Sequence, residues 1–76
     1  IADIRTLALE VPGVVDIEKC RLRKSGVGLF VELHVLVHGE TTVREGHDIG
    51  HQVKDHLLAR KPRILDAVIH LEPYEG

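Results

Sequence analysis

The side chains in this sequence that are best suited to chemistry are imidazoles, since 6 of the 76 residues are histidine. His34 and His70 lie in apolar stretches typical of β-strands, and Glu72 follows His70 by two residues. Residues two apart in a strand point to the same face of a sheet. Imidazole and carboxylate groups together suit a divalent transition metal such as Zn²⁺. We therefore predict that His34, His70 and Glu72 converge on one sheet face and bind a metal ion.

Two further residues are candidate ligands. His47 lies near the start of a predicted helix that follows the His34 strand, and Glu18 lies on an earlier strand. His51 is four residues from His47 and therefore on the same helix face, where the two could also hold a metal. Any one histidine alone is more simply an ordinary surface side chain. The metal interpretation depends on several of these groups converging.

The sequence shows no machinery for catalysis. A zincin protease site needs glutamate directly after its first histidine, but Asp48 follows His47 here. Gly26 and Gly28 are only a fragment of a glycine-rich phosphate loop, because the third glycine of that pattern is replaced by Val31. No nucleophile–base pair or paired-carboxylate hydrolase pattern is visible. We therefore predict that the chain is not an enzyme.

Length and composition further narrow the classes of protein to which this chain can belong. A chain of 76 residues forms one domain, and domains this small gain stability from disulfides, metals or partner subunits. Cys20 is the only cysteine, so no disulfide forms within the chain, and we expect its thiol to pack in the core of a protein in a reducing compartment. A net charge of -2, with Phe30 and Tyr74 as the only aromatic residues, argues against nucleic-acid binding. Metal binding and oligomerisation remain as sources of stability.

Hydrophobic spacing divides the first half of the chain into a helix and a hairpin. Apolar residues at helical spacing predict a helix over residues 1–10, which Pro12-Gly13 ends. Residues 14–24 and 29–38 are predicted strands, and Ser25 to Gly28 is a hairpin turn signal. The second strand alternates strictly, so one of its faces can line a core beneath helices.

The second half predicts a long helix and a last strand. Thr42 and Glu45 have the spacing of a capping box, so the helix runs over residues 43–59. Two glycines on its inner face, at a cost of about 1 kcal/mol each relative to alanine, indicate very close packing. The last strand covers residues 64–71, and Pro73 ends it. The predicted core-facing residues are Val43, Gly46, Ile49, Gly50, Val53 and Leu57 on the helix and Leu65, Ala67, Ile69 and Leu71 on the strand.

The element order is therefore α-β-β-α-β, which is an α+β fold. A hairpin followed by a strand–helix–strand unit gives a three-stranded mixed sheet with both helices on one face. The other face would be bare, and Phe30, Leu36 and Val68 would make it partly apolar. We predict that this bare face is a dimer surface.

Five short segments form a recognisable pattern when taken in order. They are Val11–Val14 (VPGV), Cys20–Gly26 (CRLRKSG), Val31–Val35 (VELHV), Glu45–Ile49 (EGHDI) and Val68–Pro73 (VIHLEP). Together they resemble the cytoplasmic C-terminal domain of cation diffusion facilitator transporters, and the resemblance covers nearly the whole chain.

The resemblance implies a metallochaperone-like (ferredoxin-like) fold over residues 1–76, a single cytoplasmic regulatory domain tethered to a membrane domain that this chain lacks. It implies a homodimer, or a dimer with a paralogous subunit, at the cytoplasmic face of a bacterial inner or magnetosome membrane. It also implies Zn²⁺, or Fe²⁺ or Mn²⁺, bound near the dimer interface by the residues matching His34, His47, His70 and Glu72. Metal binding would then regulate proton-coupled divalent cation efflux.

The sequence departs from the family pattern at two candidate ligands. Many relatives carry histidine where this chain has Glu18, and aspartate is common where it has Glu72. Replacing imidazole by carboxylate shifts preference toward harder ions such as Mn²⁺ or Fe²⁺, and within the family the chain resembles the magnetosome iron transporters. Two alternatives stay open: a dimerisation scaffold that recruits partners and has a vestigial metal site, and a free-standing metallochaperone.

Overall fold

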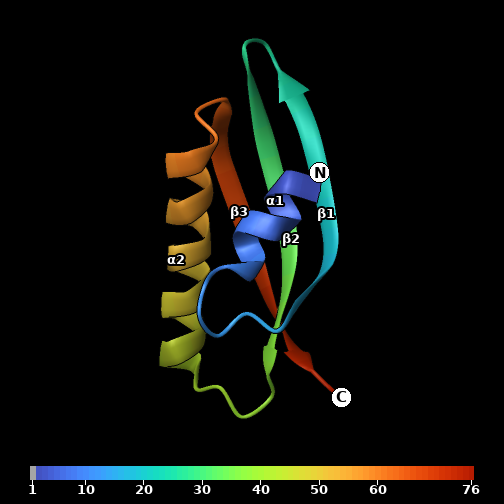
Figure 1. The fold of residues 1–76 in the computed structure, drawn as a ribbon, viewed down its shortest axis with the longest axis vertical. Coiled ribbons are helices and arrows are strands. Elements are labelled where there is room, and N and C mark those ends of the chain that lie inside the picture. Colours follow the sequence, from blue (N-terminus) through green and yellow to red (C-terminus); the bar gives the residue numbers. More distant parts are fainter. Residues whose placement is uncertain (1) are drawn as a thin grey trace.

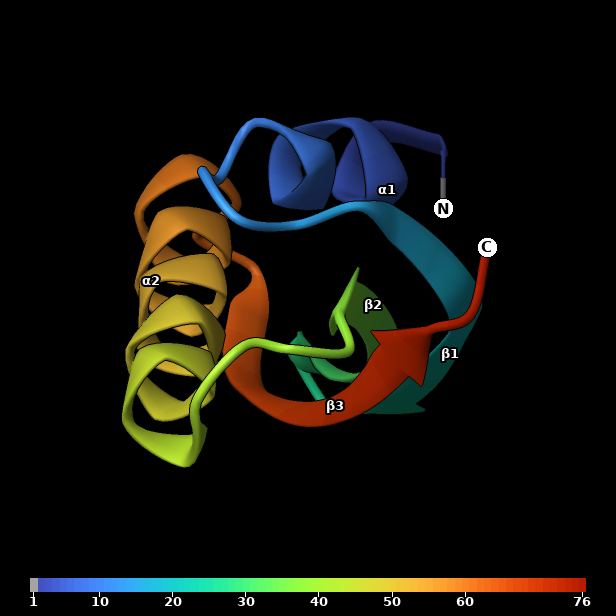
Figure 2. The same ribbon diagram turned by 90° about the horizontal axis from the view of Figure 1, so that it is seen from below.

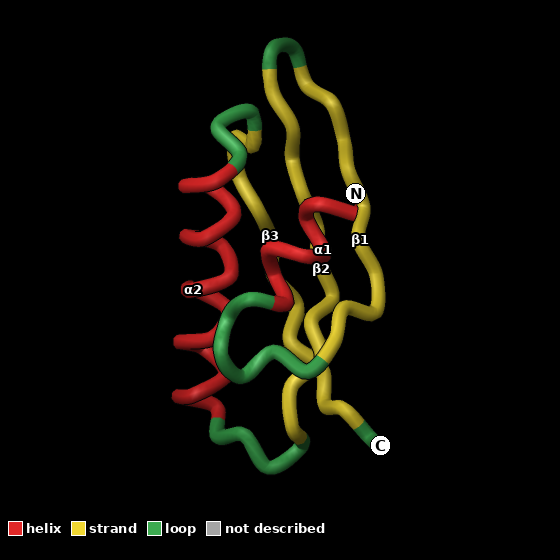
Figure 3. Tube along the Cα trace, viewed as in Figure 1, coloured by secondary structure: helices red, strands yellow, loops and turns green. Residues whose placement is uncertain are grey.

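A computed structural model describes residues 2–76, and its element order is α-β-β-α-β, as predicted (Figures 1 and 3). The predicted first helix began at Ile1, which lies outside the described residues. No helix within residues 2–76 is long and apolar enough to cross a membrane. The elements are α1 (Ala2–Leu9), β1 (Asp16–Ser25), β2 (Gly28–His38), α2 (Val43–Arg60) and β3 (Ile64–Tyr74).

The three strands form one mixed sheet in the order β1-β2-β3. β1 and β2 are an antiparallel hairpin, whereas β2 and β3 run parallel, with α2 as the connection between them. Figure 2 shows the sheet curving so that α1 and α2 lie against the same side of it. The expected fold, with one face of the sheet covered and the other bare, is confirmed.

The core lies between the two helices and the covered face of the sheet. Alternate residues of β2 supply its centre, and Leu33 and Val35 are fully buried there. Val53 and Leu57 from α2 are equally buried opposite them. Cys20 packs against this core from β1, as the sequence predicted. The rest of the core comes from Ile4, Ala8, Val11, Ile17, Val31, Val37, Ile64 and Ala67.

The start of α2 shows one confirmed prediction and one error. The Thr42 hydroxyl accepts a hydrogen bond from the backbone N–H of Glu45, and the Glu45 carboxylate accepts one from the backbone N–H of Thr42. This capping box starts the helix where it was predicted to start. Val43, however, is 91% exposed and does not belong to the core stripe. It is the first residue of the helix.

The two glycines of α2 explain how closely the helix packs on β3. A Cβ atom on Gly46 would lie 3.3 Å from Cδ1 of Leu71, and one on Gly50 would lie 3.7 Å from the same atom. Side chains larger than that of alanine at these positions would force the helix away from the strand. The predicted close approach is therefore made to the sheet.

β3 departs from the predicted pattern at both ends. Leu65 is 51% exposed and Ile64 takes its place in the core, because the pairing with β2 shifts by one residue at this point. Such a bulge reverses the alternation that the sequence suggested. Pro73 does not end the strand: it pairs with Val37 and lies inside β3. A proline is accommodated there because β3 is an edge strand whose outer side needs no backbone donor.

Candidate metal centre

The bare face of the sheet brings His34 and His70 together. His34 on β2 and His70 on β3 are direct partners in the parallel pairing. Their rings stack with centroids 4.5 Å apart and an angle of 15° between the planes. Since alternate residues of β2 are buried under the helices, the side chains between them, including His34, project from the opposite face. The predicted convergence of these two histidines is therefore found in the fold.

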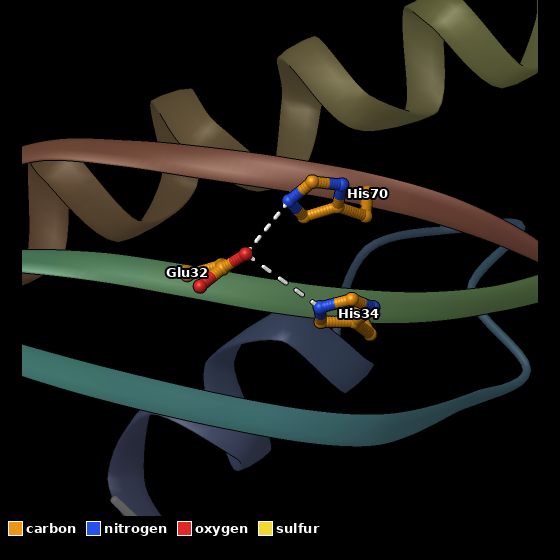
Figure 4. A group of neighbouring side chains, drawn as sticks. All are labelled: Glu32, His34 and His70. Atoms are coloured by element: carbon orange, nitrogen blue, oxygen red, sulfur yellow. Dashed lines mark ion pairs between the residues drawn. The ribbon is translucent and has the colours of Figure 1, made fainter.

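Two carboxylates bind these rings. Nδ1 of His34 lies 2.6 Å from a carboxylate oxygen of Glu72, which is the predicted third member of the group. Nε2 of His70 lies 2.9 Å from Glu32, and the same Glu32 oxygen is 3.7 Å from Nε2 of His34. Figure 4 shows Glu32 facing both imidazoles from β2. The two nitrogens of His34 therefore face carboxylates on opposite sides of its ring.

Glu32 was not among the predicted ligands, although its sequence position could have identified it. It precedes His34 by two residues on the same strand, so alternation alone places both on one face. It is half-buried, and together with His34 and His70 it offers three ligand atoms within 4.8 Å of one another. Glu32 therefore belongs to the candidate site.

Glu18 joins a second group through an irregularity in β1. The pairing of β1 with β2 shifts by one residue between Ile17 and Lys19, which leaves Glu18 as the extra residue of a bulge. Without the shift, Glu18 would share the core face with Cys20, two residues further on. Glu18, His34 and Glu72 also offer ligand atoms that all lie within 4.8 Å of one another. The two donor groups thus share His34.

The electrostatics of the second group are those of two carboxyls held close together. A hydrogen bond with Glu72, and the charge of Glu72, raise the pKa of Glu18 above its usual value. Hydrogen bonds with His34 and then with Glu18 hold the pKa of Glu72 below its usual value. Two adjacent negative charges repel each other. A cation bound between the two carboxylates would relieve this repulsion.

The donor chemistry of the site fits a divalent transition metal. The two groups combine imidazole nitrogens with carboxylate oxygens, which are ligands of Zn²⁺, Mn²⁺ and Fe²⁺. Their position on the bare face leaves the ligand atoms reachable, since Glu18 and His70 are exposed. His34, Glu32 and Glu72 are half-buried and hold fixed contacts.

His47 is not brought to this site within one chain. It lies on α2 beside a pocket of about 200 Å³ that is lined by residues of α2 and the covered face of β3. Its ring meets that of His51 edge to face, with centroids 4.5 Å apart. The sheet therefore separates His47 from His34 and His70. His56 bonds to Glu10 of the segment after α1.

Comparison with known families gives one match that covers almost the whole chain. Residues 1–74 match the family described as "Cation efflux protein, cytoplasmic domain". Among curated relatives, metal tolerance protein C1 of Arabidopsis thaliana is 29% identical over 70 residues, covering 92% of this chain and 15% of that protein. The cation-efflux pump FieF of Yersinia pestis is 36% identical over 62 residues, covering 82% of this chain and 20% of the pump. The chain thus spans a fifth or less of the length of these relatives.

Solved structures agree with this match. A cadmium form of a MamM CTD variant superposes with a TM-score of 0.94 at 28% identity, covering 97% of this chain and 92% of that one. A second MamM CTD structure gives a TM-score of 0.93 at 26% identity, covering 96% and 92% of the two chains. The metallochaperone-like fold expected from the sequence is confirmed. This chain belongs to the family of cytoplasmic domains of cation efflux proteins.

Proposed function

We propose that this chain is a metal-sensing dimerisation domain that regulates a proton-coupled divalent cation transporter from the cytoplasmic face of its membrane. The observation that supports this most directly is the pair of donor groups that share His34 on the bare face of the sheet. Histidines and carboxylates on a surface that a second subunit can contact would couple metal binding to dimerisation. The family and the names of the relatives provide the transport context.

The proposed ligands are His34, His70, Glu72 and Glu18, as the sequence predicted, together with Glu32. The first group supplies two imidazoles and one carboxylate, and the second supplies one imidazole and two carboxylates. The oxygen-rich second group favours harder ions, so the site suits Mn²⁺ or Fe²⁺ as well as Zn²⁺. His47 remains a predicted ligand, but it would act apart from these groups or with a second chain.

The surface around the ligands is suited to a second copy of the chain. Val68 on β3 is 55% exposed, and Phe30 and Leu36 on β2 are half-buried on the same face. Exposed apolar area of this kind is typical of contact surfaces. A metal that binds the closed dimer more tightly than the open one would shift the population toward the closed form. Such a shift could report cytoplasmic metal to an attached membrane domain.

The direct test is calorimetric titration of the chain with Zn²⁺ and with Mn²⁺ at neutral pH, with sedimentation measured in parallel. We expect saturable binding, and His70→Ala should weaken it at least about tenfold because a ligand is lost. His38→Ala is a matched control, since His38 is exposed at the end of β2 and belongs to neither donor group. Sedimentation should show a more compact dimer when metal is present.

A scaffold with a vestigial metal site is the second candidate. A groove of about 470 Å³ on the bare face favours it, because its lining joins apolar Phe30 and Val68 to Arg21 and Arg23. A partner segment could dock there without any metal. A stable dimer with no saturable metal binding would establish this alternative and end the sensing proposal.

A further inference from the structure

The charges of this chain are separated along its length. Residues 19–31 and 56–65 contain 7 of the 10 lysines and arginines and none of the 12 acidic residues. Both stretches reach the same end of the molecule, where the β1–β2 turn and the loop between α2 and β3 lie together (Figure 1). The backbone N–H of Leu29 donates to the carbonyl of Arg63 over 2.8 Å and joins the two. We call this the basic end: Arg23, Lys24, Arg60, Lys61 and Arg63.

The charges of the basic end are largely uncompensated. Of these five side chains within the described residues 2–76, only Lys61 forms an ion pair, with Asp3 at 3.1 Å. Arg23 lies over the ring of Phe30, with its Cζ 4.9 Å from the centroid, and that contact leaves its charge in place. At the opposite end, the loop after β2, the start of α2 and the C-terminal residues carry Glu40, Glu45, Asp48 and Glu75. Basic side chains therefore gather at one end of the molecule, whereas Arg44 is set among these acidic residues at the other, although the net charge is only -2.

Apolar surface accompanies these positive charges. Val27 is 88% exposed at the tip of the hairpin. A concavity of about 480 Å³ at this end is lined by Leu22, Leu29 and Ile64 together with Arg60, Arg63 and the Lys61–Asp3 ion pair. Aliphatic side chains next to basic groups are the combination that binds the headgroup boundary of an anionic bilayer.

We propose that the basic end docks on the anionic lipid surface of a membrane, with Val27 entering the headgroup region. This inference is independent of the proposed metal site, because the basic end includes none of its ligands. Each lysine or arginine close to such a surface strengthens binding by about fivefold. Contact at this end would place the acidic end away from the lipid and so fix the orientation of the domain.

The test is sedimentation of the chain with sucrose-loaded vesicles of phosphatidylcholine alone and of phosphatidylcholine with 30% phosphatidylglycerol, at low salt and pH 7.4. We expect binding only to the anionic vesicles, and loss of binding in 0.5 M NaCl, where charges are screened over a few ångströms. The double variant Lys24→Glu/Arg63→Glu should bind at least about 25-fold more weakly, because two attractive contacts are removed. Val27→Ser should weaken binding by a smaller factor.

The matched control is Arg44→Glu compared with Arg63→Glu, since both change the net charge by the same amount. Arg44 lies at the acidic end, in the first turn of α2. Arg44→Glu should bind vesicles like the unaltered chain, and circular dichroism should show that all variants are folded. Equal loss in both variants, or equal binding to neutral vesicles, would overturn the proposal. Tighter binding to a 20-nucleotide DNA probe than to anionic vesicles would also overturn it, in favour of a nucleic-acid surface.

Discussion

The imidazole rings of His34 and His70 stack face to face, with centroids 4.5 Å apart, because the two residues are direct partners in the parallel β2–β3 pair. The sheet itself therefore fixes their separation. Their carboxylate partners differ: Glu72 meets Nδ1 of His34, and Glu32 meets Nε2 of His70. His34 belongs to both donor groups, whereas His70 belongs to one. The two histidines should therefore contribute unequally to the affinity for metal.

Replacing His34 should impair metal binding more than replacing His70. His34→Ala removes the imidazole common to both groups, whereas His70→Ala leaves Glu18, His34 and Glu72 in place. We expect His34→Ala to lose more than the roughly 10–100-fold that removal of a supporting residue costs a metal site. Calorimetric titration with Zn²⁺ measures this directly. Equal affinities for the two variants would contradict the shared role of His34.

Replacing Glu32 should change metal preference as well as affinity. Glu32→Gln keeps the shape of the side chain but removes the charge that faces both imidazoles. Carboxylate ligands matter most to hard ions, so the affinity for Mn²⁺ should fall by a larger factor than the affinity for Zn²⁺. The ratio of the two dissociation constants is the measurement. An unchanged ratio would place Glu32 outside the coordination sphere.

Much of this site could be predicted because two simple rules govern it. Strict alternation in residues 29–38 placed His34 on the face opposite the core, and the strand–helix–strand connection placed β3 beside it. Their combination brings His70 to His34 without any knowledge of side-chain contacts. The capping box of α2 was equally local, since it depends only on residues three apart.

Irregular pairing explains what could not be predicted. Glu18 and Leu65 each lie at a register shift, where an extra residue in one strand reverses the faces that simple alternation assigns to its neighbours. The position of His47 depends on which side of the sheet α2 covers and on how the helix is rotated there. Its sequence spacing from His34 therefore gave no sign that the sheet separates the two.

The glycines of α2 should respond differently to alanine. At Gly50 an added Cβ would make ordinary contacts, the nearest at 3.7 Å, so Gly50→Ala should stabilise the fold by up to about 1 kcal/mol through helix propensity. At Gly46 the nearest contact would be 3.3 Å, to Cδ1 of Leu71, so part of that gain should be lost. Urea unfolding of both variants tests the difference. A larger gain at Gly46 than at Gly50 would mean that Leu71 yields easily.

Removing a core side chain should change the stability of the fold much more than either glycine substitution. Leu33 is fully buried at the centre of β2, and Leu33→Ala leaves a cavity that its rigid neighbours fill only in part. We expect a loss of about 2–5 kcal/mol in the free energy of unfolding. In a domain of 76 residues this is a large part of the total stability. Denaturant unfolding of a folded Leu33→Val variant provides a milder comparison if the alanine variant does not fold.

The capping box makes stability depend on pH in a definite direction. The backbone N–H of Thr42, followed by its side chain, holds the pKa of Glu45 below its usual value. The Glu45 carboxyl therefore loses its proton more readily in the native state than in the unfolded chain, where glutamates have a pKa of about 4.3. The stabilisation by Glu45 is present above that pH and is lost as the pH falls through the lower native pKa. The difference in unfolding free energy between the unaltered chain and Glu45→Gln should thus shrink from pH 6 to pH 3. Thr42→Ala should cost about 1 kcal/mol at neutral pH and return the pKa of Glu45 toward its usual value, which NMR titration measures. A constant difference between the unaltered chain and Glu45→Gln across this pH range would show that the Glu45 charge does not support the helix.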